Sequence, residues 1–204
     1  MVIGCGTPIP GHDVRVVDAA GLELPDRQEG HLQFRGPSST TGYYRNPEAT
    51  RGLFAGGDWL NTGDRAYLSD GVIFITGRKK DIIIRGGRNI SPYELEQAVG
   101  DLAGIRRGCV AVFGSTDAAT GTERVVVLAE MRDRDASRHA DLKRMINELA
   151  VSLIGAPADD IVLAPPATVP KTSSGKIRRV AAREFYERGP AAVKSQAVWL
   201  QFAR

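Results

Sequence analysis

Hydrophobic and polar residues follow two different patterns along this chain of 204 residues. In the first part, short apolar runs are separated by turns, and residues 31–35 alternate with the period of two that predicts a half-buried strand. Further strands are predicted at 14–17 and, after a Ser-Asp-Gly turn, at 72–75. The segment 36–66 is rich in Gly, Thr, Asn and Asp, so we expect long loops there, carried on a β scaffold.

From about residue 80 the pattern indicates strands and helices together. A strand at 81–84 is expected to enter the loop 85–88, and the continuous apolar runs at 109–113 and 125–129 predict buried strands. One face of a later helix is predicted to carry Leu142, Met145, Ile146, Leu149 and Leu153. Strand, helix, strand, strand and helix within about 90 residues predict a compact α+β domain.

The first helix of this second part has a well-defined start and end in the sequence. Ser91 is the expected N-cap, Pro92 takes the first helical position, and Glu94 is placed to close a capping box. The helix should bury Leu95 and a valine four residues later, and end at Gly100.

Composition is that of an ordinary globular protein, with 42% hydrophobic and 25% charged residues. Apolar runs are only a few residues long, so no transmembrane segment is predicted, and no secretory signal is visible at the start. Cys5 and Cys109 lack metal or redox spacing, and the three histidines are scattered, which argues against a metal site. We therefore expect a reduced, cytoplasmic, soluble protein.

The net charge of +3 is too small to imply binding of nucleic acid, but basic residues cluster in two places, 78–88 and 171–183. Each cluster could be a solvated face or could focus positive charge on an anionic small molecule. Tyr93 alone does not provide the stacking platform that nucleic-acid binding needs.

The candidate phosphate-binding segment 171–176 fails the P-loop pattern, because Pro170 stands where glycine is needed and Ile177 replaces the magnesium-binding hydroxyl. No G-x-G-x-x-G fingerprint is present either. A Walker NTPase and a Rossmann domain are both rejected.

Five segments together resemble the closing motifs of the acyl-adenylate-forming enzymes, a superfamily of acyl-CoA synthetases, fatty-acyl-AMP ligases, luciferases and peptide-synthetase adenylation domains. In chain order they are Gly-Tyr-Tyr-Arg-Asn-Pro-Glu at 42–48, Trp-Leu-Asn-Thr-Gly-Asp at 59–64, Gly-Arg-Lys-Lys-Asp at 77–81, Gly-Gly-Arg-Asn-Ile-Ser-Pro-Tyr-Glu-Leu-Glu at 86–96, and Pro-Lys-Thr-Ser-Ser-Gly-Lys at 170–176.

The resemblance implies a division of the chain. Residues 1–77 would be a small β-barrel subdomain that closes the large adenylation domain, and 78–188 would be the mobile C-terminal α+β lid. Residues 189–204 leave the lid pattern and would start a linker or a further domain.

The resemblance also implies roles in the first half-reaction. Asp64 would accept hydrogen bonds from the ribose hydroxyls of ATP or AMP, and Arg78 would reach the ribose or phosphate. Lys176 would be the catalytic lysine of adenylation, whose ammonium stabilises the charge that builds on the α-phosphate. Lys171 is assigned to the surface.

For the second half-reaction, thioester formation, the family implies a rotation of the lid about Lys80. The rotation would bring Arg85, Gly86 and Gly87 beside a pantetheine arm, where a side chain on either glycine would block a narrow tunnel. Asn89 would then face the nucleotide.

By resemblance, the full-length enzyme would convert a carboxylic acid and ATP to acyl-AMP and then transfer the acyl group to CoA or to the phosphopantetheine of an acyl carrier protein. The Mg²⁺ ligands, the phosphate loop and the acid pocket would lie upstream, so we expect the fragment alone to be inactive. Similarity to fatty-acyl-AMP ligases at 107–113, 170–179 and 183–186 favours a fatty acid. The loop 86–89 is instead similar to CoA ligases, so the acceptor stays open. The alternative is a stand-alone lid-like module that docks on a carrier protein or a partner synthetase.

Overall fold

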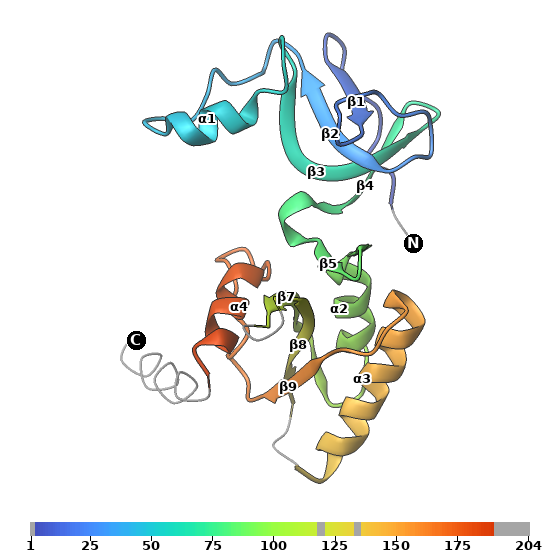
Figure 1. Cartoon of the computed structure of the whole chain (residues 1–204), viewed down its shortest axis with the longest axis vertical. Coiled ribbons are helices and arrows are strands. Elements are labelled where there is room, and N and C mark those ends of the chain that lie inside the picture. Colours follow the sequence, from blue (N-terminus) through green and yellow to red (C-terminus); the bar gives the residue numbers. More distant parts are fainter. Residues whose placement is uncertain (1–2, 118–120, 133–135, 190–204) are drawn as a thin grey trace. The chain divides into compact units, whose positions relative to one another are not determined.

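The computed structural model describes residues 3–117, 121–132 and 136–189. The chain divides into two compact units, Met1–Lys80 and Asp81–Arg204, shown in Figure 1. Arg78, placed by the sequence in the second region, thus belongs to the first unit. Apart from Gly189, the predicted linker at 189–204 lies outside the described residues.

The first unit contains an antiparallel sheet whose strands pair in the order β1-β2-β3-β4. Its strands are β1 (Asp13–Val17), β2 (Gly30–Arg35), β3 (Leu60–Ser69) and β4 (Val72–Arg78). A small core of Val16, Leu32 and Ala66 covers one face of this sheet. The strands predicted at 14–17, 31–35 and 72–75 are confirmed.

The expected β-barrel is not confirmed, because the sheet is open in the described residues. The backbone around Cys5 extends the sheet at β4, with the Cys5 N–H donating to the Ile73 carbonyl at 2.7 Å and the Ile73 N–H donating to Gly6. Within the described part of the chain, no pairing joins this segment to β1 and so closes the sheet.

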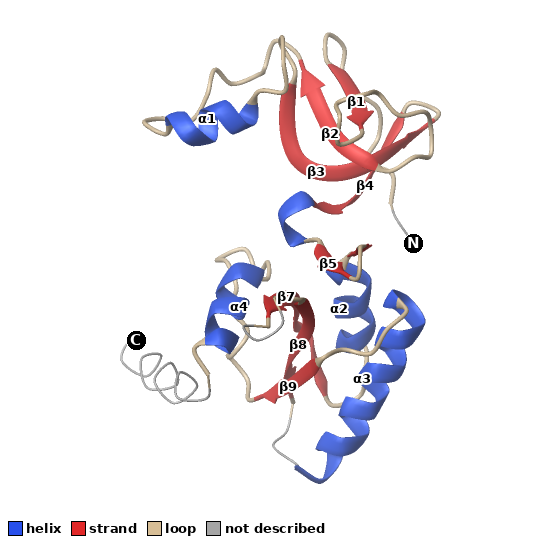
Figure 2. Cartoon of the chain, in the orientation of Figure 1, coloured by secondary structure: helices blue, strands red, loops and turns tan. Residues whose placement is uncertain are grey.

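The prediction of long loops over 36–66 is wrong in two places. A helix, α1 (Pro47–Leu53), begins after Asn46, whose side chain accepts a hydrogen bond from the Ala49 N–H. Residues 60–66 belong to β3, a strand that extends to Ser69 (Figure 2). The Thr-Gly-Asp segment therefore lies on a strand, which holds its side chains more firmly than a loop would.

The second unit is built on the sheet β7-β8-β9, in which β8 pairs antiparallel with β7 and parallel with β9. Its larger elements are α2 (Pro92–Gly100), β7 (Ile105–Thr116), β8 (Glu123–Met131), α3 (His139–Ile154), β9 (Asp160–Ala164) and α4 (Arg179–Glu187). The smaller ones are β5 (Ile83–Arg85), β6 (Arg88–Ile90) and the 3₁₀ turns η1 (Lys79–Asp81), at the boundary between the units, and η2 (Ala136–Arg138). Helix α3 supplies the crossover that a parallel strand pair requires.

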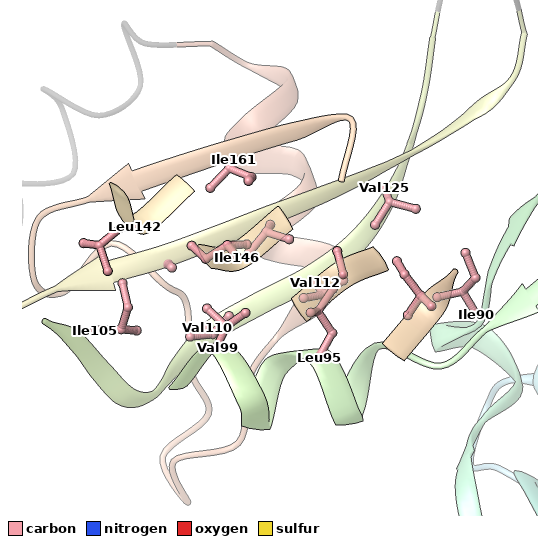
Figure 3. Close-up of a cluster of buried hydrophobic side chains, with 14 of the residues drawn as sticks. Ile90, Leu95, Val99, Ile105, Val110, Val112, Val125, Leu142, Ile146 and Ile161 are labelled. Carbon is pink, nitrogen blue, oxygen red and sulfur yellow. The ribbon is translucent and has the colours of Figure 1, made fainter. Parts of the chain in front are cut away.

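Both faces of this sheet are buried, which explains why its strands read as continuous apolar runs. Val110 and Val112 face α2 and α3, and Figure 3 shows them beside Leu95 and Val99 of α2. The alternate residues of the sheet pack in a second cluster with α4, which contributes Ala182 and Phe185. The α+β prediction is confirmed for this unit.

Two details of the helices differ from the sequence prediction. Ser91 is the N-cap of α2, but its side chain makes no capping hydrogen bond, so the predicted capping box is wrong. In α3 the buried residues are Leu142, Ile146, Ala150 and Ile154, whereas Met145 and Leu153 are 37% and 41% exposed. The predicted stripe is rotated because the sheet accepts a narrow face spaced by four residues. None of the described helices is long and apolar enough to cross a membrane.

Candidate functional site

Lys176 lies on a tight hairpin between β9 and α4, which we call the lysine hairpin (residues 170–178). The Thr172 N–H donates to the Lys176 carbonyl at 2.8 Å, and the Thr172 hydroxyl accepts from the Lys176 N–H at 3.0 Å. Gly175 has a φ of +83°, a conformation that glycine adopts without the steric cost of a side chain. Backbone and hydroxyl groups thus satisfy one another within the hairpin, which presents Lys176 to solvent.

The two lysines of this hairpin are in different surroundings. The Lys171 ammonium donates to the Sγ of buried Cys109 at 3.1 Å. The Lys176 ammonium has no hydrogen-bond or ion-pair partner in the described ranges of the chain. Of the two, Lys176 is therefore the cation available to an anionic ligand.

Gly86 and Gly87 form the two-residue turn of a second hairpin, the glycine hairpin (residues 83–90), between β5 and β6. Their φ angles are +55° and +76°, and hairpin turns of two residues favour residues that adopt positive φ at both positions. A Cβ added at either glycine would meet no atom within 4 Å. The turn favours glycine at both positions because their φ angles are positive. The space around the turn is open at the place where the wall of a thiol tunnel is predicted.

Arg85 is anchored to the body of the second unit. Its guanidinium donates to the Pro157 carbonyl and to the Asp159 carboxylate, both at 2.8 Å. Asn89 is exposed on β6, and its backbone faces Ile84 of β5 in the strand register. These contacts show that Arg85 anchors the glycine hairpin to the rest of the second unit. Its place beside a thiol stays a prediction.

Asp64 and Arg78 are directly opposite each other on β3 and β4 of the first unit. The Arg78 Nε lies 3.3 Å from the Asp64 Oδ1, and the Arg78 side chain is 56% exposed. The Thr62 hydroxyl accepts from the Asp64 N–H and donates to the Leu32 carbonyl, which fixes the local backbone. Because the arginine is largely exposed, solvent weakens this ion pair, so Arg78 can exchange it for a polar ligand.

Lys80 ends the first unit within η1, and its side chain is exposed. It has no ion-pair partner in the part of the chain that is described. Its position between the two units is that of the predicted hinge.

Arg179 is not among the residues predicted for the site, because in the sequence it lies within a basic stretch that could be solvated. The Arg179 guanidinium donates from Nε and Nη2 to the two carboxylate oxygens of Glu96, at 2.8 and 2.5 Å, and from Nη1 to Asp81 at 2.6 Å. It also stacks on the Tyr93 ring at 4.1 Å, and the Tyr93 hydroxyl donates to Asp81. The sequence held a signal for Glu96 alone, because a residue four after Pro92 and three before Val99 lies on the buried face of the helix. It held none for the partners of this glutamate.

Burial shapes the charges of this cluster. Desolvation raises the pKa of the Glu96 carboxyl, opposed by the hydrogen bonds from Arg179 and from the Val112 N–H. Desolvation alone would lower the pKa of Arg179, but the Glu96 carboxylate outweighs it and holds that pKa above its ordinary range. Arg179 therefore stays charged, as its charge-assisted hydrogen bonds to two carboxylates require. We call this arrangement of Arg179 with Glu96 and Asp81 the Arg179 fork.

Metal ligands are not gathered anywhere in residues 3–117, 121–132 and 136–189, which contain no group of three or more His, Cys, Asp or Glu side chains able to hold an ion.

No family model matches the chain. It is 39% identical over 186 residues to the protein named "Putative acyl-CoA synthetase" of Caulobacter vibrioides, covering 91% of this chain and 32% of that protein. It is 34% identical over 191 residues to the Long-chain-fatty-acid–AMP ligase FadD28 of Mycobacterium tuberculosis, covering 85% of this chain and 32% of that protein. The solved structure of McyG A-PCP complexed with phenylalanyl-adenylate matches with a TM-score of 0.81 and 32% identity, covering 100% of this chain and 36% of that one.

The chain belongs to the acyl-adenylate-forming enzymes. It corresponds to the C-terminal portion of these enzymes and spans about a third of the length of the curated relatives that it matches. The names of the relatives that share this portion refer to different acids and products. The similarity therefore identifies the family but does not identify the acid or the acceptor.

Proposed function

We propose that the protein is an acid-activating ligase, which forms an acyl-adenylate from a carboxylic acid and ATP and then transfers the acyl group to a thiol. The observation that carries the proposal is the Lys176 ammonium, which has no partner among the residues that the structure describes and is presented on a hydrogen-bonded hairpin, while Lys171 donates to Cys109. A fatty acid is the proposed substrate, because curated relatives include fatty-acid ligases.

In this reaction Lys176 would contact the α-phosphate as the carboxylate attacks it. The hairpin fixes the backbone from which the ammonium extends before the reaction begins. A charge presented in this way would stabilise the transition state more than the ground state. On the first unit, Asp64 would accept hydrogen bonds from the ribose hydroxyls, and Arg78 would turn from Asp64 to a ribose or phosphate oxygen.

For the second half-reaction, we propose that Lys80 is the hinge and that the glycine hairpin replaces the lysine hairpin at the reacting centre. Gly86 and Gly87 would line the path of a pantetheine arm, and Asn89 would face the nucleotide. The acceptor of the acyl group would be CoA or the phosphopantetheine of an acyl carrier protein.

The test is a hybrid protein in which this chain replaces the matching third of FadD28. The hybrid and FadD28 lacking that third are each incubated with ATP, magnesium and a labelled long-chain fatty acid, and acyl-AMP is measured. We expect acyl-AMP from the hybrid and none from the shortened FadD28. A folded hybrid with the melting curve of FadD28 and no acyl-AMP would contradict the proposal and favour a docking module.

The acid and the acceptor need a separate measurement, because the FadD28 part would supply the acid pocket of the hybrid. The protein expressed from its whole gene is given fatty acids of different length, with CoA present or absent. Acyl-CoA as the product would identify a CoA ligase, whereas acyl-AMP that accumulates despite CoA would identify a ligase that uses a carrier protein.

A further inference from the structure

We propose that Arg179 is a positioning residue, which sets the orientation of the lysine hairpin through a buried fork to Glu96 and Asp81. The inference rests on the proposed function for its consequence in catalysis, but its structural part stands on the contacts of the second unit alone. Arg179 touches no reacting atom in this proposal and acts through Lys176.

The fork joins three segments that are distant in the sequence. Arg179 begins α4, and its side chain is only 11% exposed. Glu96 belongs to α2, and Asp81 is the first residue of the second unit, directly after the predicted hinge Lys80. One guanidinium therefore holds the end of the lysine hairpin to the residue beside the hinge and to the helix that follows the glycine hairpin.

The two ends of the lysine hairpin have different anchors. At the incoming end, the Val169 N–H donates to buried Glu130 at 2.8 Å. At the outgoing end, the Arg178 N–H closes the base on the Pro170 carbonyl at 2.9 Å, and the next residue is Arg179. The outgoing end is also held by the packing of Ile177 and of α4 in the second cluster. Loss of the Arg179 fork would therefore loosen the direction of the hairpin tip without unfolding of the sheet.

The glycine hairpin has anchors of its own. Arg85 holds it to Pro157 and Asp159, and the Ile84 N–H donates to Glu123 at 2.6 Å. These contacts share no side chain with the Arg179 fork. The two hairpins should therefore respond separately to substitution, which a general loss of stability would not produce.

The decisive variants are Arg179→Lys and Arg179→Gln. A lysine keeps the charge but replaces the planar fork by a single ammonium, so it cannot donate to both oxygens of Glu96 and to Asp81 with the same geometry. Arg183→Gln is the matched control, because Arg183 lies exposed on the same helix and has no ion-pair partner in the described residues.

The first measurement is amide hydrogen exchange on the 204-residue chain, which requires no activity. We expect the amides of Thr172 and Arg178 to exchange about tenfold faster or more in both Arg179 variants, with the β8 amides unchanged. Arg183→Gln should leave both regions unchanged. Unchanged exchange in the hairpin of a folded variant would overturn the inference, as would loss of protection throughout the second unit in both variants.

The second measurement uses the FadD28 hybrid and separates the half-reactions. For Arg179→Lys we expect kcat for acyl-AMP formation to fall about 10- to 100-fold with KM for ATP within about twofold, because misplacement by about 1 Å has effects of this size. Thioester formation from supplied acyl-AMP should stay within about twofold. Equal losses in both half-reactions would overturn the positioning role. An inactive unsubstituted hybrid would instead contradict the proposed function, and this inference would then be tested by the hydrogen-exchange result alone.

Discussion

The two hairpins of the second unit share a backbone design and differ in what they present. Each has a glycine with positive φ at its tip and is anchored by an arginine that donates to at least one carboxylate: Arg85 lies next to the tip of the glycine hairpin, and Arg179 directly follows the base of the lysine hairpin. The lysine hairpin presents an ammonium without a partner in the described part of the chain, and the glycine hairpin presents two residues without side chains. Two similar hairpins thus present a cation that would stabilise the charge of adenylation and an open surface that would admit a pantetheine arm. These are the features that the two successive half-reactions would require.

The largest effect that would test this contrast is expected from Lys176→Ala in the FadD28 hybrid. Acyl-AMP formation should fall about 10²- to 10³-fold, the size found when a preorganised charge-stabilising group is removed. Thioester formation from supplied acyl-AMP should survive. Lys171→Ala is the control, and it should leave acyl-AMP formation nearly unchanged because Lys171 is engaged with Cys109.

Equal loss of both half-reactions in Lys176→Ala would contradict the division of labour between the hairpins. A loss in Lys171→Ala as large as that in Lys176→Ala would show that the wrong lysine has been assigned.

The converse variant is Gly86→Trp, which places a large side chain where the structure has open space. Thioester formation should fall at least about tenfold while acyl-AMP formation persists, because only the thiol path would be blocked. Any L-residue at this φ of +55° is strained by about 1–2 kcal/mol, so Gly86→Asn, which tolerates this conformation better, is the control. If Asn and Trp lower thioester formation equally, the glycine serves the turn and not a tunnel.

A smaller effect is expected from Asp159→Asn, which removes the carboxylate that Arg85 contacts and that also accepts from the Val125 N–H. Weakening this anchor should lower thioester formation about threefold to tenfold and the free energy of unfolding by about 1–3 kcal/mol. Acyl-AMP formation, measured at a temperature where the variant is folded, should stay within about twofold. An unchanged rate of thioester formation would show that Arg85 does not act through this anchor.

The smallest effect is expected from Ser91→Ala at the start of α2, next to the glycine hairpin. A capping box would make this change cost about 1 kcal/mol, but the Ser91 side chain makes no capping bond. We therefore expect the free energy of unfolding to change by less than about 0.5 kcal/mol in chemical denaturation. A loss near 1 kcal/mol would restore the capping box that the sequence suggested.

Much of the second unit could be predicted from the sequence because its signals are local. Continuous apolar runs predicted β7 and β8, and Pro92 and Gly100 marked the ends of α2. The prediction of the buried face of α3 is wrong at Met145 and Leu153, which are apolar but remain partly exposed to solvent. In the first unit, α1 was missed because a short helix among glycines and prolines has little apolar periodicity to reveal it.

The sequence by itself determined the family, since five motifs in the right order need no tertiary information, and it selected Lys176 and the paired glycines by their place in those motifs. The tertiary structure alone decided which charged groups are free and which are engaged. Arg179 meets Glu96 and Asp81 across 83 and 98 residues of chain, and Arg85 meets Asp159 across 74. Ion pairs between such distant residues leave no periodic trace in a sequence, because only the packing of the strands and helices brings their side chains together.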